Sequence, residues 1–125
     1  MRLEHVNITV NDIEQSRRFY AELFGFETRW EGTATGRAGP VKAVHLGTGD
    51  TYLSLFETDD PGRAPADYGA AGMNHFALQV EDLAPYRKRL ADMGVELHLD
   101  EDYEPGKRIY FYDPSGVEIE LVSYA

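Results

Sequence analysis

The sequence contains an internal repeat, and this repeat constrains the fold more than any other feature. Residues 4–13 (EHVNITVNDI) match residues 74–83 (NHFALQVEDL), an offset of 70 positions. Each copy has a histidine, then an alternating apolar strand, then an Asp that opens a helix. The other matching pairs are residues 21–27 with 91–96 and residues 53–55 with 119–121. The repeat therefore predicts two modules of equal topology.

Each half of the repeat predicts one helix and four strands. The first helix covers residues 13–24, with Asp12 as its cap and Gly25 as its stop, and the second covers residues 83–93. The predicted strands are residues 3–10, 26–30, 41–46, 52–56, 74–80, 95–99, 108–112 and 117–122. Predicted turns lie at residues 47–50 and 113–116. Each half therefore has the order βαβββ.

The expected fold class is α+β, with two pseudo-symmetric βαβββ modules that form a concave sheet. The 125 residues suit one domain, with module one over about 1–57 and module two over about 74–125. Residues 58–73 are rich in Gly, Pro, Ala and Asp without a period, which predicts a linker. Each helix covers one face of its small sheet and leaves the other face open.

Composition excludes several functions. The chain has no cysteine, so thiolate metal sites, disulfides and cysteine nucleophiles are excluded. The net charge of −10 argues against a nucleic-acid partner, whose phosphates require clustered Lys and Arg. No apolar run approaches the length of a membrane span, and the first predicted strand begins too early for a signal peptide. We expect a cytoplasmic protein that binds neither nucleic acid nor membrane.

Two histidines and a glutamate are expected on the open faces. Strand alternation turns Val6, Ile8 and Val10 toward the helix, and turns His5, Asn7 and Thr9 away from it. The same count puts His75 on the open side of its strand, and Glu118 and Glu120 on the open side of the last strand. Two imidazoles and a carboxylate suit one divalent metal ion, which is Fe, Zn, Ni, Co or Mn. The alternative is that all three are ordinary polar residues, but the repeat relates His5 to His75 and favours the metal site.

The pattern resembles the vicinal oxygen chelate superfamily, which includes glyoxalase I, bleomycin resistance proteins and extradiol dioxygenases. The resemblance covers nearly the whole chain. It rests on residues 3–6 (LEHV), 19–25 (FYAELFG), 74–77 (NHFA) and 113–121 (DPSGVEIEL). It implies paired βαβββ modules, often in a homodimer, with His5, His75 and Glu120 at metal-ligand positions. It also implies a small-molecule substrate with adjacent oxygen atoms, and either lyase or isomerase chemistry or dioxygenase chemistry.

Two other kinds of protein in the superfamily that the chain resembles remain as alternative functions. A metal-free drug-binding protein of the bleomycin-resistance type typically lacks the ligand set, so His5, His75 and Glu120 count against it. A fosfomycin-modifying transferase also uses two His and one Glu. The short stretch after Glu120 and the sparse basic residues weigh against a phosphonate site of that kind.

The fourth ligand position departs from the glyoxalase I pattern. Ser54 stands where that enzyme has a Glu or Gln beside the metal, and a hydroxyl is a poor base for moving a proton between carbons. Glu57 is near, but we expect it to point to the helix side. Half of an extradiol dioxygenase signature is present around Tyr110, which would then lie near the substrate.

The remaining candidate residues have two readings each. His45 is either a catalytic proton carrier on the open face or a packed or solvated side chain. Arg108 either binds a substrate carboxylate or pairs with the acidic residues 100–102. Asn7, Tyr52 and Ser54 are expected to line the substrate site if the alternation holds.

Overall fold

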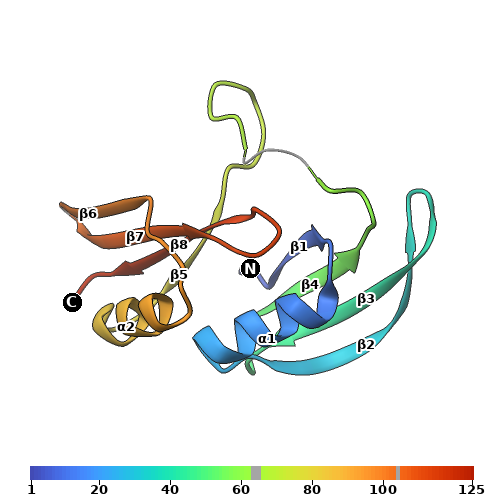
Figure 1. The fold of residues 1–125 in the computed structure, drawn as a ribbon, viewed down its shortest axis with the longest axis horizontal. Coiled ribbons are helices and arrows are strands. Elements are labelled where there is room, and N and C mark those ends of the chain that lie inside the picture. The colour runs from blue at the N-terminus through green and yellow to red at the C-terminus, as the bar shows by residue number, and fades with distance from the viewer. Residues whose placement is uncertain (63–65, 104) are drawn as a thin grey trace. The chain divides into compact units, whose positions relative to one another are not determined.

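Both halves of the chain fold with the same strand order, as the repeat predicts. The computed structural model describes residues 1–62, 66–103 and 105–125. It divides into two compact units, Met1–Gly62 and Arg63–Ala125, whose boundary falls within the segment predicted as a linker. The first unit contains a sheet of order β1-β4-β3-β2, and the second a sheet of order β5-β8-β7-β6 (Figure 1). The predicted α+β class is confirmed.

Each unit contains four strands and one helix among the described residues. The first unit consists of β1 (His5–Val10), α1 (Ile13–Phe24), β2 (Glu27–Gly36), β3 (Gly39–Gly47) and β4 (Tyr52–Glu57). The second consists of β5 (Phe76–Gln79), α2 (Ala84–Asp92), β6 (Leu99–Tyr103), β7 (Gly106–Tyr112) and β8 (Glu118–Ser123). In each sheet the first and last strands of the unit pair in parallel, and the other pairs are antiparallel.

The register aligns the two units residue by residue. Asn7 pairs with Ser54 in the first sheet, and Ala77 pairs with Glu120 in the second. Since Asn7 and Ala77 are related by the sequence repeat, Ser54 and Glu120 hold equivalent places. The predicted equivalence of these two residues is therefore correct.

Helix α1 is fixed at both ends by side chains and glycine. Asp12 accepts a hydrogen bond from the Gln15 backbone N–H at 3.1 Å, which satisfies one of the free donors of the first turn. Glu57 accepts another from the Ile13 N–H at 2.8 Å, so it points to the helix side as expected. Gly25 ends the helix with φ of 70°, a left-handed conformation that disfavours a Cβ.

Gly25→Ala should lower the free energy of unfolding by about 1–2 kcal/mol, the cost of a left-handed L-residue. No atom lies within 4 Å of the added methyl group, so the backbone conformation alone causes the loss. Gly49→Ala is the matched control, because its methyl group also meets no atom within 4 Å and its φ is not positive. Urea unfolding measures both, and equal stability of the two variants would contradict the prediction.

Apolar residues on the helix side of each sheet form the core. In the first unit α1 buries Ile13, Tyr20 and Leu23, and all three are 0% exposed. They belong to the same core as buried residues of β1, β3 and β4, which are Ile8, Val10, Val44, Leu46, Leu53 and Leu55. In the second unit Leu90 is the buried residue of α2, and the sheet buries Ile109, Phe111, Ile119 and Leu121. Each helix runs beside the sheet of its own unit in Figure 1.

One strand differs from its predicted position. The strand expected at residues 95–99 lies at Leu99–Tyr103 instead. Val95 continues the end of α2, where its N–H donates to the Leu90 carbonyl at 2.9 Å after the left-handed Gly94. The β6–β7 register, with Leu99 opposite Tyr110, instead pairs the acidic residues 100–102 with β7. These residues form an edge strand of the sheet, where charge is common.

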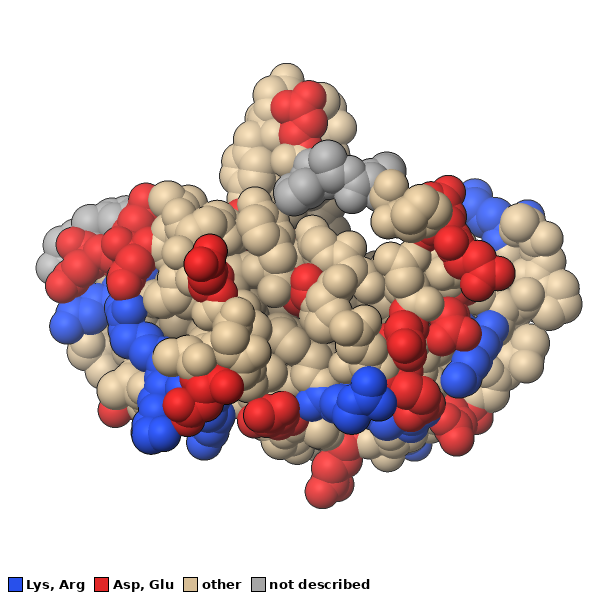
Figure 2. Space-filling model, in the orientation of Figure 1, with Lys and Arg blue, Asp and Glu red and all other residues tan. Residues whose placement is uncertain are grey.

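The surface mixes acidic and basic side chains. On the face drawn in Figure 2, Lys and Arg lie beside Asp and Glu rather than apart from them. Arg17 pairs with Glu31 at 2.8 Å, and Lys88 pairs with Asp92 at 2.8 Å. Within the described part of the chain, no helix has both the length and the apolar character needed to cross a membrane.

Candidate metal centre

His5 lies on the open face of the first sheet, held by an adjacent carboxylate. The burial of β1 alternates, with Ile8 and Val10 buried while Asn7 and Thr9 are exposed. His5 Nδ1 lies 2.9 Å from Glu4 Oε1, and the Tyr52 hydroxyl donates to the same oxygen at 3.2 Å. The hydrogen bond to His5, and then the one to Tyr52, lower the pKa of Glu4. With Nδ1 facing a carboxylate, Nε2 is the nitrogen that remains for a metal ion.

Rings on this face form a row that includes His45. The His5 and Tyr52 rings stack with centroids 4.7 Å apart, and Tyr52 lies 4.7 Å from His45. His45 is in turn 5.0 Å from Trp30. His45 pairs in register with Ser54, so it shares the open face with His5. The alternative of a core position on the helix side is therefore excluded.

His45 should make stability pH-dependent. Burial first, and then the charges of His5 and Arg29, lower the pKa of His45 below its ordinary value of 6.5. Around the ordinary pKa of 6.5, the unfolded chain therefore binds more protons at this position than the folded chain does. The free energy of unfolding contributed by His45 rises with pH in that range. The contribution is present above the unfolded pKa and is lost as the pH falls. In urea unfolding from about pH 5 to 8, His45→Gln should have a flatter profile than the wild type. An NMR pKa of 6.5 or above for His45 would contradict this.

Ser54 is a buried partner of Asn7. Asn7 Nδ2 donates to the Ser54 carbonyl at 3.0 Å and lies 3.3 Å from its hydroxyl. Ser54 is only 6% exposed. Its place in the first sheet is the place of Glu120 in the second, so the first unit has a short neutral side chain where the second has a carboxylate.

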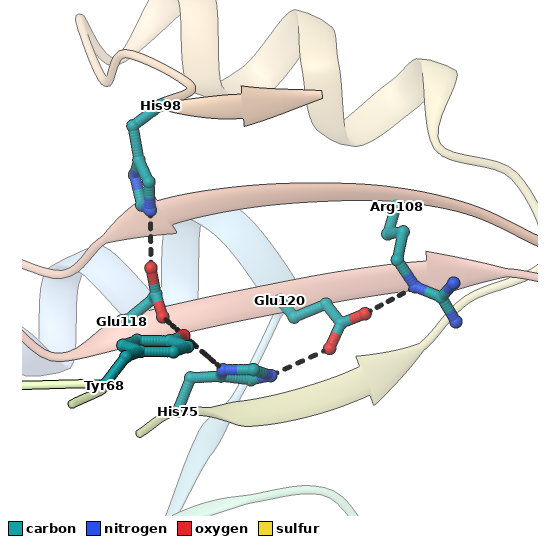
Figure 3. A network of polar contacts seen from close by, with 6 residues as sticks. All are labelled: Tyr68, His75, His98, Arg108, Glu118 and Glu120. Atoms are coloured by element: carbon teal, nitrogen blue, oxygen red, sulfur yellow. Dashed lines mark hydrogen bonds and ion pairs between the residues drawn. The ribbon is translucent and has the colours of Figure 1, made fainter. Parts of the chain in front are cut away.

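In the second unit His75 and Glu120 are direct neighbours. His75 Nε2 lies 3.0 Å from Glu120 Oε2, and Arg108 Nε donates to the other oxygen, Oε1, at 2.7 Å (Figure 3). Glu120 and Arg108 are both buried, at 8% and 9% exposure. Arg108 thus binds the carboxylate of Glu120. The sequence had led us to expect either a substrate carboxylate or the acidic residues 100–102 as its partner.

The nitrogen and oxygen atoms of the His75–Glu120 pair could both be ligands of one divalent cation. A neutral imidazole nitrogen without a proton and a carboxylate oxygen are both acceptors, so a proton or a metal ion has to lie between them. Two ligands about 2.1 Å from one ion, at a right angle, are about 3.0 Å apart. Imidazole with carboxylate also suits Zn, Fe, Ni, Co and Mn. Among residues 1–62, 66–103 and 105–125, no three His, Asp or Glu side chains gather around one point. The second unit supplies two of the three predicted ligands, and His5 belongs to the first unit.

Three polar residues of this site were missed by sequence reasoning. The Tyr68 hydroxyl lies 2.8 Å from His75 Nδ1 and donates to Glu118, and His98 Nε2 lies 2.6 Å from the second Glu118 oxygen (Figure 3). Burial raises the pKa of Glu118, but hydrogen bonds from Tyr68 and His98 outweigh it and hold the pKa below its ordinary range. Strand alternation did place Glu118 on the face of Glu120. No periodic signal marked Tyr68, which lies in the predicted linker.

Tyr110 lies beside the predicted ligands. It pairs in register with Glu120, and its ring meets the His75 ring edge to face, with centroids 5.5 Å apart. Tyr110 is also 6.3 Å from the His98 ring. The tyrosine predicted to lie near the substrate therefore shares a face with two predicted metal ligands.

Two sheets of one topology, each with histidines on its open face, define an α+β protein built from a duplicated βαβββ module. The family model described as the Glyoxalase/Bleomycin resistance protein/Dioxygenase superfamily matches residues 2–121, and the chain belongs to this superfamily. The resemblance inferred from the sequence is thereby confirmed.

Relatives of the chain agree with this assignment. Protein YwkD of Bacillus subtilis strain 168 is 31% identical, over 95% of this chain and 94% of its own. Glutathione transferase FosA of Serratia marcescens is also 31% identical, over 95% of this chain and 78% of its own. A glyoxylase/bleomycin resistance protein/dioxygenase domain from Frankia has the same fold, with a TM-score of 0.81 at 24% identity, over 98% of this chain and 91% of its own.

Proposed function

We propose that this protein is an enzyme that uses one divalent metal ion to act on a small molecule with adjacent oxygen atoms. His5, His75 and Glu120 would hold the ion. The observation that carries the proposal is the 3.0 Å approach of His75 Nε2 to Glu120 Oε2, two atoms that can share either a proton or a metal ion. The similarity to glutathione transferase FosA supports an enzyme rather than a passive binding protein.

The residues around the ion would have separate tasks. A bound ion supplies Lewis-acid chemistry, which stabilises negative charge on substrate oxygens. Arg108 holds one oxygen of Glu120 and leaves the other for the ion. Tyr110 and His45, which share faces with the ligands, are the proposed proton carriers. The proposed substrate-binding residues are Asn7, Tyr52, Ser54 and Arg108.

The reaction class depends on the metal. Iron would favour dioxygenase chemistry, while zinc, nickel or cobalt would favour lyase or isomerase chemistry. A second candidate is group transfer to a small molecule, which the 31% identity to glutathione transferase FosA favours. The alternative without metal is drug binding of the bleomycin-resistance type. A homodimer in the cytoplasm is proposed from the family resemblance, and light scattering after size-exclusion chromatography tests the dimer.

Metal analysis of protein purified without chelator or His-tag tests the proposal. We expect one equivalent of a first-row divalent metal per chain, and its identity selects the reaction class. If the protein carries no metal and binds none of Fe(II), Zn(II), Ni(II), Co(II) or Mn(II) on titration, the proposal is wrong. Binding of a bleomycin-type drug by such a protein would then support the metal-free alternative.

A further inference from the structure

We propose that Arg29 and Trp30, together with Tyr52 and His45, bind an aromatic carboxylate on the open face of the first sheet. The inference rests on the proposed function and deepens it, because it names planar aromatic acids as the class of small molecule that the enzyme takes. Arg29 and Trp30 lie on β2, the edge strand of that sheet (Figure 1). Neither residue belongs to the proposed ligand set or to the substrate-binding residues named above.

An irregularity of β2 turns its side chains toward the open face. Thr28 pairs with Leu46, which is 0% exposed, so this pair lies on the helix side. The next pair is Trp30 with His45, which lies on the open face. Arg29 is the extra residue between the two pairs. In a regular strand Trp30 would share the side of Thr28, whereas a bulge redirects the side chains that follow it.

The guanidinium of Arg29 also reaches the open face, where it lies over the Tyr52 ring. Its Cζ atom is 4.7 Å from the ring centroid, a cation–π contact. Among the residues that the structure describes, no carboxylate forms an ion pair with Arg29. Glu4, which accepts from the Tyr52 hydroxyl at 3.2 Å, is engaged with His5 instead. Because the N–H groups of a guanidinium match the two oxygens of a carboxylate, Arg29 fits an anionic ligand.

The rings beside Arg29 suit a flat partner. The Trp30 indole extends over Gly32, where an added Cβ would lie 2.8 Å from Trp30 Cζ2. Trp30 nevertheless remains 44% exposed. The centroid of its ring lies 5.0 Å from that of His45, which lies 4.7 Å from that of Tyr52. Aromatic faces of this kind bind a planar ring, and one well-placed charge orients it.

The same face continues to a proposed metal ligand. The Tyr52 ring stacks on His5, with centroids 4.7 Å apart and planes within 15°. A ring bound beside Trp30 therefore lies on the face that carries His5. We assign the aromatic acid to the substrate for this reason.

The test is a titration of the metal-free full chain with three small probes. Trp30 is the single tryptophan of the chain, so its indole N–H gives one NMR signal. Benzoate is planar and anionic, benzamide is planar and neutral, and cyclohexanecarboxylate is anionic and puckered. We expect benzoate to shift the Trp30 signal and to bind roughly tenfold more tightly than benzamide. It should bind roughly fivefold more tightly than cyclohexanecarboxylate.

Two variants assign these preferences to the two residues. Arg29→Gln should remove the preference for benzoate over benzamide. Trp30→Leu, followed through the backbone signals of β3, should remove the preference for benzoate over cyclohexanecarboxylate. Both replaced residues are exposed, so the fold should survive. Arg18→Gln changes an exposed arginine of α1 in the same unit and should keep both preferences.

The results separate this site from the metal centre. Equal affinities for benzoate and benzamide in the wild type would overturn the inference, as would an unchanged preference in Arg29→Gln. Benzoate binding that leaves the Trp30 signal in place would also overturn it. A protein that binds benzoate at Trp30 but no Zn(II) keeps the aromatic-acid site and loses the proposed metal centre. A protein that binds Zn(II) but no benzoate loses the aromatic-acid site alone.

Discussion

His75→Ala should abolish stoichiometric metal binding by this protein. The substitution removes the Nε2 atom that lies 3.0 Å from Glu120 Oε2, and leaves the carboxylate without an imidazole partner. Loss of a direct ligand should weaken metal affinity by more than the roughly 10–100-fold that follows loss of a residue hydrogen-bonded to a ligand. Calorimetric titration with Zn(II), and metal analysis of the purified variant, measure the effect. Full metal occupancy in His75→Ala would show that His75 is not a ligand.

Glu120→Gln gives the companion measurement. Glutamine keeps the shape of the side chain but removes its negative charge, so we expect Zn(II) affinity to fall strongly here too. Glu96→Gln makes the same change at an exposed residue of the same unit and should leave the affinity unchanged. A loss in both variants would point to a general charge effect rather than to a ligand.

Arg108→Met should lower the free energy of unfolding by about 3 kcal/mol in metal-free protein. The substitution leaves the Glu120 carboxylate, which is 8% exposed, without the cation that donates to Oε1 at 2.7 Å. The value lies at the lower end for a broken buried pair because His75 remains next to Oε2. Urea unfolding in the presence of chelator measures the change.

Two further variants isolate the ion pair. Lys107→Met changes the exposed neighbour of Arg108 on β7 and should stay within about 0.5 kcal/mol of the wild type. Arg108→Met combined with Glu120→Leu removes both charges, and should recover most of the loss, since no buried charge is then left unpaired. Wild-type stability in the single Arg108→Met variant would contradict a role for the pair.

The fold was largely predictable because the same sequence pattern occurs in both halves of the chain. Capping by Asp12, the stop at Gly25 and the strand alternation of β1 follow local rules, and all are present. The strand expected at residues 95–99 was misplaced because its apolar residues look like a strand but serve the end of α2. The acidic β6 has no apolar alternation, and its place is set by pairing with β7, which is a long-range contact.

The candidate site was predictable only along the strands. Alternation placed Glu118 and Glu120 on one face and related Ser54 to Glu120, and the register agrees. Tyr68 comes from a segment without any period, and His98 lies just before β6, so no pattern connected either to His75. Polar networks between separate segments depend on side-chain geometry, which local sequence patterns do not predict.

Anomalous X-ray diffraction from crystals of the protein loaded with Zn(II) tests the central claim most directly. We expect one strong zinc peak per chain, about 2.0–2.2 Å from the Nε2 atoms of His5 and His75 and from a carboxylate oxygen of Glu120. Ser54 should not be a ligand, and the remaining positions should hold water or substrate. A zinc ion bound elsewhere, or a site closed by four protein ligands that include Ser54, would contradict the account.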